Sequence, residues 1–334
     1  MEFNDYEAFI QKVARYYEAK GQEATPLLIE QAKNKIIKAY QKQYLSILKE
    51  FVKETNNTLG LGTTPTQTDL GGLLIQMEAR LEELNNGLKT NTLTGLKESY
   101  LTAHVTHAKA VNDALTLLQL AEEVPYALLN HSRFETMALD TMEDLSMANA
   151  HAIRQLKKAV REIFQEQLVL ATLGETTNKD VVKAIQDRLT KKAIEQKITK
   201  TGLVGMVDKG GKRWNLKTYI EMVVDTKLQS CYHEGLKDRG YQTGYDLVQV
   251  SEKGSRTPCR YFEGMVLSMT GQTKGYMTYD EAKATGMIFH PNCRHTCYPM
   301  TSFDLLHEVD QQRHETRMNQ LEAGLERYDR RSKN

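Results

Sequence analysis

The residues with the most distinctive chemistry gather in two short segments toward the C-terminal end of the chain. The first segment holds Cys259. The second segment holds four more such residues: His290, Cys293, His295 and Cys297. A glycine-rich stretch separates the two segments, so we expect them to meet in the folded protein. Thiolates and imidazoles are preferred zinc ligands, and these five residues exceed the four ligands that a tetrahedral ion needs. A structural zinc ion is therefore one interpretation of this cluster.

Two other interpretations of the cluster stay open. The Cys293-x3-Cys297 spacing is not the usual two-residue spacing of a zinc knuckle, so we favour metal-free packing of buried thiols and hydrogen-bonded imidazoles. The third interpretation is catalytic, with Cys259 as a nucleophile that His290 or His295 activates. The sequence offers no identifiable oxyanion hole or third orienting group, which makes catalysis the weakest interpretation. We expect a protein that is not an enzyme and has neither a cofactor nor a small-molecule substrate.

Local charge is less balanced than the whole chain. The 334 residues hold 44 Lys and Arg against 43 Asp and Glu, which gives no strong overall field. Residues 121–150 carry a balance of −5, which favours a protein partner, whereas residues 181–217 carry +7. Phosphate contacts need only positive charge, so the basic stretch is either a binding site for double-stranded DNA or a solvated face. The candidate DNA contacts are Lys191, Lys192, Lys197, Lys200, Lys209, Lys212, Arg213 and Lys217.

The sequence gives no sign of export or membrane insertion. Residues 1–5 are acidic and lack the pattern of a secretory signal. Charged residues interrupt every apolar run well short of the roughly 18 residues that a spanning helix needs. The four cysteines are too sparse for a disulfide framework and suit a reducing compartment. We therefore expect a chain made in the cytoplasm, without a membrane partner.

The elements before residue 200 are predicted to be helices, because apolar residues recur there at steps of three and four. We assign Thr25 as a helix N-cap with Pro26 at the first helical position, and Asn85-Asn86-Gly87 as a helix stop. Glycine, proline and polar β-branched residues over 60–68 predict a loop. The predicted helices are two within 6–53, then 73–84, 93–123, 145–170 and 181–194.

A different pattern begins near residue 200, where short apolar runs alternate with glycine-rich turns. The elements predicted there are two strands within 202–216, a helix over 216–238, strands at 246–251 and 264–268, and a turn of helix at 279–284. Loops should dominate residues 252–300. We expect a mainly α fold with a small α+β module: a helical domain over 1–200, the module over 201–305, and a charged tail over 306–334 that is a frayed helix or disordered.

Four motifs in the last third of the chain appear in a fixed order. They are Gly211–Met222, Gly244–Ser251, Pro258–Gly271 and His290–His295. Together they resemble the phage minor capsid protein family, a branch of the minor head or head-morphogenesis proteins of tailed bacteriophages. Relatives often end the last motif with Cys-Arg-Cys, where this chain has Cys-Arg-His. The motif residues expected to matter for structure are Trp214, Tyr219, Gly264, Asn292 and Arg294.

The resemblance implies a structural virion protein that is made in the bacterial host cytoplasm. Such a protein would be present in few copies in the capsid interior or near the portal, and would act in head assembly. Its implied partners are the portal, scaffold or major capsid protein, together with packaged DNA. The alternative that we keep open is a nucleic-acid-binding protein that protects or pilots phage DNA, which predicts salt-dependent binding.

Overall fold

The structure of the protein, a computed structural model, divides into two compact units, each made of separated chain segments. It describes residues 3–59, 67–113, 115–116, 119–120, 131–172, 180, 183, 204–207, 211 and 213–332. Unit 1 comprises Met1–Lys33, Thr94–Met137 and Asp225–Asn334, and unit 2 comprises Asn34–Leu93 and Ala138–Val224. The domain boundaries at residues 200 and 305 stay predictions.

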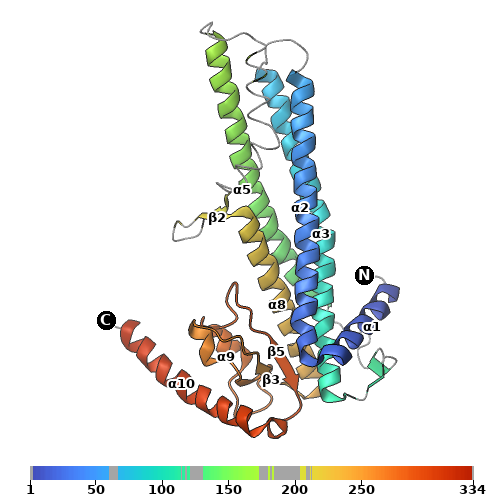
Figure 1. The fold of residues 1–334 in the computed structure, drawn as a ribbon, viewed down its shortest axis with the longest axis vertical. Coiled ribbons are helices and arrows are strands. Elements are labelled where there is room, and N and C mark those ends of the chain that lie inside the picture. The colour runs from blue at the N-terminus through green and yellow to red at the C-terminus, as the bar shows by residue number, and fades with distance from the viewer. Residues whose placement is uncertain are drawn as a thin grey trace. The chain divides into compact units, whose positions relative to one another are not determined.

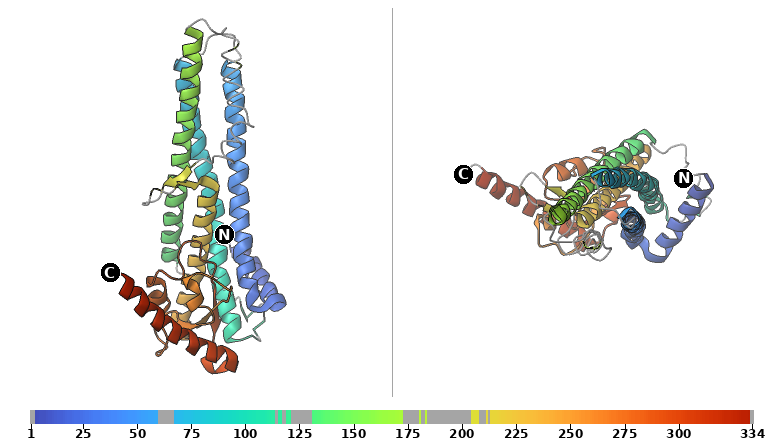
Figure 2. Two further views of the ribbon diagram at one scale, coloured as in Figure 1. Left: turned by 60° about the vertical axis from the view of Figure 1, so that its left-hand side comes forward. Right: turned by 90° about the horizontal axis from the view of Figure 1, so that it is seen from above.

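Unit 2 is built from long helices whose buried faces follow the helical period. It contains stretches of α2 (Ala24–Leu59), α3 (Gln67–Val111), α5 (His131–Thr172) and α8 (Leu216–Thr243). Its stretches of α2, α3 and α5 lie side by side (Figures 1 and 2). Buried apolar side chains recur along them at steps of three, four or seven, as an amphipathic helix requires. Examples are Leu73, Met77, Leu84 and Leu88 of α3 and Ala138, Leu145, Ala148 and Ala152 of α5.

A buried polar link joins three helices of unit 2. The Tyr40 hydroxyl of α2 donates a hydrogen bond of 2.9 Å to Asn149 Oδ1 of α5. The Asn149 amide donates in turn to Asn85 Oδ1 of α3, at 2.8 Å. Because buried polar groups are costly when unpaired, this link favours one register of the three helices over alternatives. A hairpin of β1 (Val204–Val207) and β2 (Arg213–Asn215) then leads into α8.

The helical part of unit 1 is centred on the C-terminal stretch of α3. Helix α1 (Phe3–Lys20) is followed by a 3-10 turn, η1 (Gly21–Glu23). One face of α1 joins α3 in a buried apolar cluster whose members are Tyr6, Phe9, Ile10, Val13, Ala14, Leu28, Leu101, Val105, Ala108 and Leu120. The spacing of the α1 members at three and four residues explains why this segment is helical.

Within unit 1, α3 and α8 approach each other closely at Gly235. A Cβ atom added there would lie 2.7 Å from Ala103 Cβ and 2.8 Å from the carbonyl oxygen of Tyr100. Two hydrogen bonds run between the same helices, from Ser99 Oγ to the Leu228 carbonyl at 2.7 Å and from Cys231 Sγ to a carbonyl of α3 at 3.4 Å. Glycine is therefore required at this crossing for steric reasons.

A three-stranded antiparallel sheet forms the rest of unit 1. The central strand β3 (Leu247–Val250) pairs with β4 (Val266–Ser268) on one side and β5 (Cys297–Met300) on the other. Short elements connect the strands: η3 (Pro258–Tyr261), α9 (Tyr279–Ala284) and, after β5, η4 (Phe303–Leu305). A complete capping box starts α9, because Thr278 and Glu281 exchange side-chain and backbone hydrogen bonds.

The charged C-terminal segment forms a helix, α10 (Glu308–Ser332), which runs past the sheet in Figure 1. Its His314 is buried, and the ring Nδ1 accepts the backbone N–H of Val266 in β4 at 3.1 Å. Leu321 is also buried. This segment was expected to be either a frayed helix or disordered, and the structure shows a helix.

The predicted fold class is confirmed, since the protein is mainly helical with a small antiparallel sheet toward its C-terminal end. The hairpin and the helix at 279–284 lie where the sequence places them. Within the described part of the chain, no helix combines the length and apolarity needed to cross a membrane.

Several local predictions are wrong. Helix α3 continues through Asn85-Asn86-Gly87, because its buried face and the bond to Asn149 extend across this segment, and it ends at Val111 rather than near 123. Helix α2 begins at Ala24, so Thr25 lies inside its first turn. Strand β5 forms in a stretch predicted as loop. Its local sequence favours a strand only weakly, and pairing with β3 decides the structure. The helix predicted at 181–194 falls almost entirely outside the described residues.

Candidate functional site

The Cys/His cluster is assembled from two loop segments beside the sheet. Cys259 lies in η3, and Cys293 and His295 lie in the segment that enters β5. One ligand atom from each of these three residues lies within 4.8 Å of the others, and all three residues are buried. The structure thus brings together two distant segments, as their composition suggests. This tight group is named the Cys/His group below.

Each cysteine of the Cys/His group faces an imidazole nitrogen. Cys293 Sγ lies 3.4 Å from His295 Nδ1, and Cys259 Sγ lies 3.3 Å from Nε2 of the half-buried His290. The Cys259 thiol is also 3.1 Å from the carbonyl oxygen of Met287, to which it can donate. His290 therefore borders the Cys/His group on the Cys259 side.

A tight turn positions the second segment. The His290 carbonyl accepts the backbone N–H of Cys293 at 2.9 Å, which leaves Pro291 and Asn292 at the two central positions. Asn292 adopts a φ of 65°, a left-handed conformation that asparagine tolerates better than most residues. Proline followed by a residue with positive φ is the pattern of a type II turn. This explains why Asn292 is useful although its side chain is exposed.

A buried glutamate completes the site, and sequence reasoning missed it. Glu263 Oε1 lies 2.9 Å from His295 Nε2 and accepts the backbone N–H groups of Lys253 at 3.0 Å and Ser255 at 2.9 Å. Burial alone raises the pKa of Glu263, but these hydrogen bonds outweigh it and lower the pKa overall. The available signal was an acid inside the apolar run 262–267, because a carboxylate is seldom buried without partners.

The series of contacts from Cys293 to His295 to Glu263 resembles a nucleophile, a base and an orienting carboxylate. The thiolate is the reactive form of cysteine, however, and burial raises the pKa of the Cys293 thiol to about 11. A thiol that keeps its proton at neutral pH is a weak nucleophile. The arrangement therefore suits ligand binding or packing better than covalent catalysis.

Cys297 lies outside the Cys/His group. It is fully buried in β5, where burial raises the pKa of its thiol, and its backbone carbonyl accepts the Tyr232 hydroxyl at 3.0 Å. The spacing between Cys293 and Cys297, on which the metal-free interpretation rests, thus involves a cysteine that is not part of the group.

The other motif residues are divided between the two units. Trp214 is half-buried in β2 and Tyr219 is buried in α8, both in unit 2. Arg294 is exposed. Gly264 has a φ of 77°, and a Cβ atom there would lie 2.6 Å from Cδ of Arg313 in α10. Glycine at 264 therefore allows both the turn and the close approach of α10.

The predicted DNA contacts are mostly beyond what the structure describes. Lys191, Lys192, Lys197, Lys200, Lys209 and Lys212 lie outside the described residues, and Arg213 is described only as part of β2. Lys217 is exposed in the first turn of α8, with its Nζ 3.7 Å from Glu221 Oε1.

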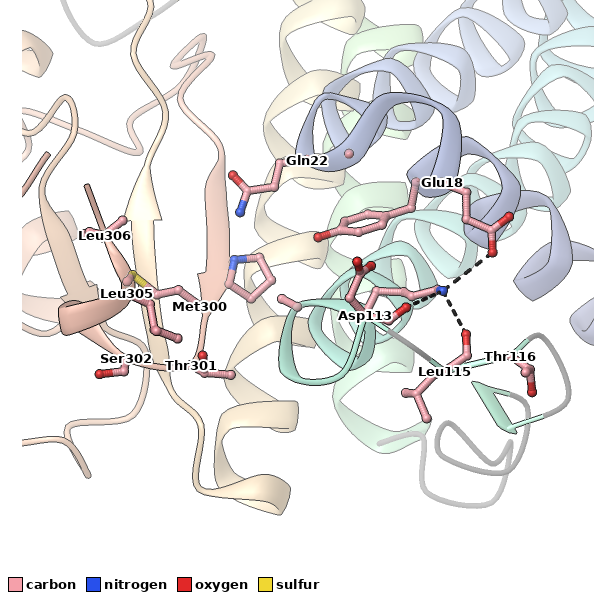
Figure 3. Close-up of a pocket in the computed structure, with 15 residues that line it drawn as sticks. Glu18, Gln22, Asp113, Leu115, Thr116, Met300, Thr301, Ser302, Leu305 and Leu306 are labelled. Carbon is pink, nitrogen blue, oxygen red and sulfur yellow. Dashed lines mark hydrogen bonds and ion pairs between the residues drawn. The ribbon is translucent and has the colours of Figure 1, made fainter.

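A pocket of about 870 Å³ in unit 1, which the sequence did not predict, is lined by the ends of α1 and α3, by β5 and by η4 (Figure 3). The Lys109 ammonium at its wall donates to the carbonyl oxygens of Asp113 at 3.1 Å and Leu115 at 2.8 Å, and lies 3.6 Å from Glu18. The protein itself therefore satisfies this buried charge. No local sequence signal marks the pocket, because its lining comes from several separate segments.

The described part of the chain thus combines long helices, a small antiparallel sheet and a buried Cys/His group. The family model described as phage minor capsid protein 2 matches residues 25–324, which include most of both units. No curated protein and no solved structure matches the chain. The chain belongs to the phage minor capsid protein 2 family, and the resemblance seen in its motifs is thereby confirmed. It is a bacteriophage capsid protein, found in the virion and in contact with other head components.

Proposed function

We propose that this capsid protein acts in assembly of the phage head near the portal, through contacts with the portal, scaffold or major capsid protein. The observation that carries the proposal is the family match over residues 25–324. The proposed role is structural, in the capsid interior or at the portal, and not enzymatic. The buried Cys293 thiol, with its raised pKa, supports this view.

An exposed face of α5 in unit 2 is suited to a protein partner. Leu139, Glu143 and Met147 lie four residues apart on one side of the helix, so they share a face. Leu139 is 68% exposed and Met147 is 56% exposed, so two large apolar side chains are exposed together on this face. With the exposed Asp140 and Glu143 beside them, these residues favour a partner surface that is apolar and basic.

The test is co-expression of the chain with the portal, scaffold and major capsid proteins of the same phage, followed by affinity purification. The double variant Leu139→Asp, Met147→Asp should lose most of the co-purifying head protein, because it places charge in the apolar contact. Ile75→Asp is the matched control, since Ile75 is also 68% exposed in unit 2. Equal recovery of head protein with the unaltered chain, the double variant and the Ile75→Asp control would refute the α5 contact. Absence of any head protein with the unaltered chain would refute the assembly role.

Contact with packaged DNA is a second candidate function, favoured by the balance of +7 over residues 181–217. Replacing Lys191, Lys192, Lys197 and Lys200 by Ala should weaken DNA binding and flatten its dependence on salt, because each lost phosphate contact removes counterion release. The control replaces Lys38, Lys42, Lys53 and Lys89, which are exposed elsewhere. Filter binding at two salt concentrations measures both effects. Identical salt slopes for the two variants would count against this function.

A further inference from the structure

We propose that Cys259, Cys293, His295 and His290 bind one zinc ion in a tetrahedral site, with Glu263 as the carboxylate that orients one imidazole. This metal site goes beyond the assembly role and does not depend on it. The ion would connect η3 to the segment that enters β5.

The distances between the facing atoms are close to those of a zinc site. Zinc–sulfur and zinc–nitrogen bonds of about 2.3 and 2.0 Å at a tetrahedral angle place the two ligand atoms about 3.5 Å apart. The Cys293–His295 pair is at 3.4 Å and the Cys259–His290 pair is at 3.3 Å. The ligand atoms of Cys259, Cys293 and His295 lie within 4.8 Å of one another, and His290 Nε2 lies beside the Cys259 thiol, so side-chain movements would bring all four ligands around one ion.

Hydrogen bonds set both imidazoles in the form that a metal needs. Glu263 Oε1 accepts the backbone N–H groups of Lys253 and Ser255 and lies 2.9 Å from His295 Nε2. With the carboxylate as acceptor, Nε2 carries the proton and Nδ1 faces Cys293 with its lone pair. His290 Nδ1 lies 2.9 Å from the Pro291 carbonyl oxygen and donates to it, so its Nε2 faces Cys259 with its lone pair. Metal-bound histidines commonly have such a carboxylate or carbonyl partner on the other ring nitrogen.

The same contacts also describe the competing state without metal, in which each thiol donates to a neighbouring acceptor. Binding of Zn²⁺ would release the two thiol protons to solvent, and the thiolate of Cys259 would lose its hydrogen bond to the Met287 carbonyl. In exchange, the ion would connect two loop segments that few regular elements hold together. Small loop-rich regions frequently gain stability in this way.

Metal binding is tested on the full chain, purified without chelator and analysed for zinc, then stripped and titrated with Co²⁺. We expect one zinc per chain, and with Co²⁺ a thiolate-to-metal charge-transfer band together with the d–d absorption of tetrahedral cobalt. Cys259→Ser and Cys293→Ser should each weaken zinc binding by more than roughly 100-fold. Saturating zinc should raise the thermal midpoint by roughly 5 °C or more.

Two controls separate ligation from a general loss of structure. Cys297→Ala removes an equally buried thiol outside the Cys/His group and should keep the metal. Glu263→Gln should lower zinc affinity by about 10- to 100-fold at unchanged stoichiometry, whereas the exposed Glu308→Gln should have no effect. Circular dichroism monitors folding of every variant. A purified chain that contains no zinc and binds no added Co²⁺ would overturn the site, as would equal metal loss in Cys297→Ala and Cys293→Ser.

Discussion

Unit 2 and unit 1 are stabilised in different ways. In unit 2, repeated apolar faces of long helices supply the buried surface, and the Tyr40–Asn149–Asn85 link adds a buried polar contact. The sheet-containing part of unit 1 has short strands and long loops, where buried acids each bind several donors. Loss of one such acceptor leaves several groups unpaired at once, so unit 1 should be more sensitive to single substitutions than unit 2.

The largest effect is expected at Asp246, which precedes β3. Its carboxylate accepts the Ser268 hydroxyl at 2.5 Å, the Thr270 hydroxyl at 2.6 Å and the Thr273 hydroxyl. Asp246→Ala should lower the free energy of unfolding by about 3 to 4 kcal/mol, because it leaves the buried Ser268 hydroxyl and the half-buried Thr270 and Thr273 hydroxyls without this acceptor. Urea unfolding measures this, with the exposed Asp304→Ala as control. A loss below about 1 kcal/mol would argue against the special sensitivity of unit 1.

The next effect is a pH dependence carried by buried histidines of unit 1. Burial lowers the pKa of His107 to about 4 and that of His233 to about 3, and it also lowers the pKa of His104. These rings stay neutral in the folded state but take up protons near pH 6.5 when unfolded, so stability should fall as pH drops below about 6.5. Between pH 7 and pH 5 the loss should be about 2 kcal/mol per histidine.

Urea unfolding at pH 7 and pH 5 measures this dependence. His107→Gln should reduce the difference between the two pH values by about 2 kcal/mol. His307→Gln is the control, because His307 is exposed. An unchanged difference in His107→Gln would show that His107 is not neutral and buried as described.

The two smallest effects compare one glycine in each unit. Gly235→Ala in unit 1 should cost about 1.5 kcal/mol, since its Cβ would meet Ala103 at 2.7 Å and the Tyr100 carbonyl at 2.8 Å. Gly71→Ala in unit 2 should instead stabilise the protein by about 0.5 to 1 kcal/mol, because no atom lies within 4 Å of the added Cβ and alanine favours helix. Thermal unfolding of the two variants gives the change in stability for each. If both substitutions change stability in the same direction, the two units do not differ at these positions.

The sequence predicted the helices well because their signal is local. The spacing of Leu73, Met77 and Leu84 is sufficient to assign a helical face, whereas α3 continues through Asn85-Asn86-Gly87 with the contact to Asn149. That contact joins residues distant in sequence and leaves no local trace. The same reason explains why β5 was missed, since Pro299 suits an edge strand only once β3 is beside it.

At the site, the sequence identified the residue types but not the final set. Cys259, Cys293 and His295 were expected to meet and do so, whereas Cys297 is directed to β5 by strand pairing. Glu263 was overlooked, although a buried acid requires partners and His295 is one. Clusters of unusual residues locate a site, but a folded chain is needed to show which members share it.

The interleaved composition of unit 1 has a consequence for synthesis on the ribosome. Its first segment, Met1–Lys33, emerges early, but the α8 residues that cover α3 at Gly235 and the strands of the sheet come after residue 224. The apolar face of α1 and α3 therefore remains partly exposed to solvent until most of the chain has been translated. Such long-range closure slows folding and prolongs exposure to aggregation, so prematurely terminated chains should be insoluble. Only completed chains would then be available for incorporation into particles.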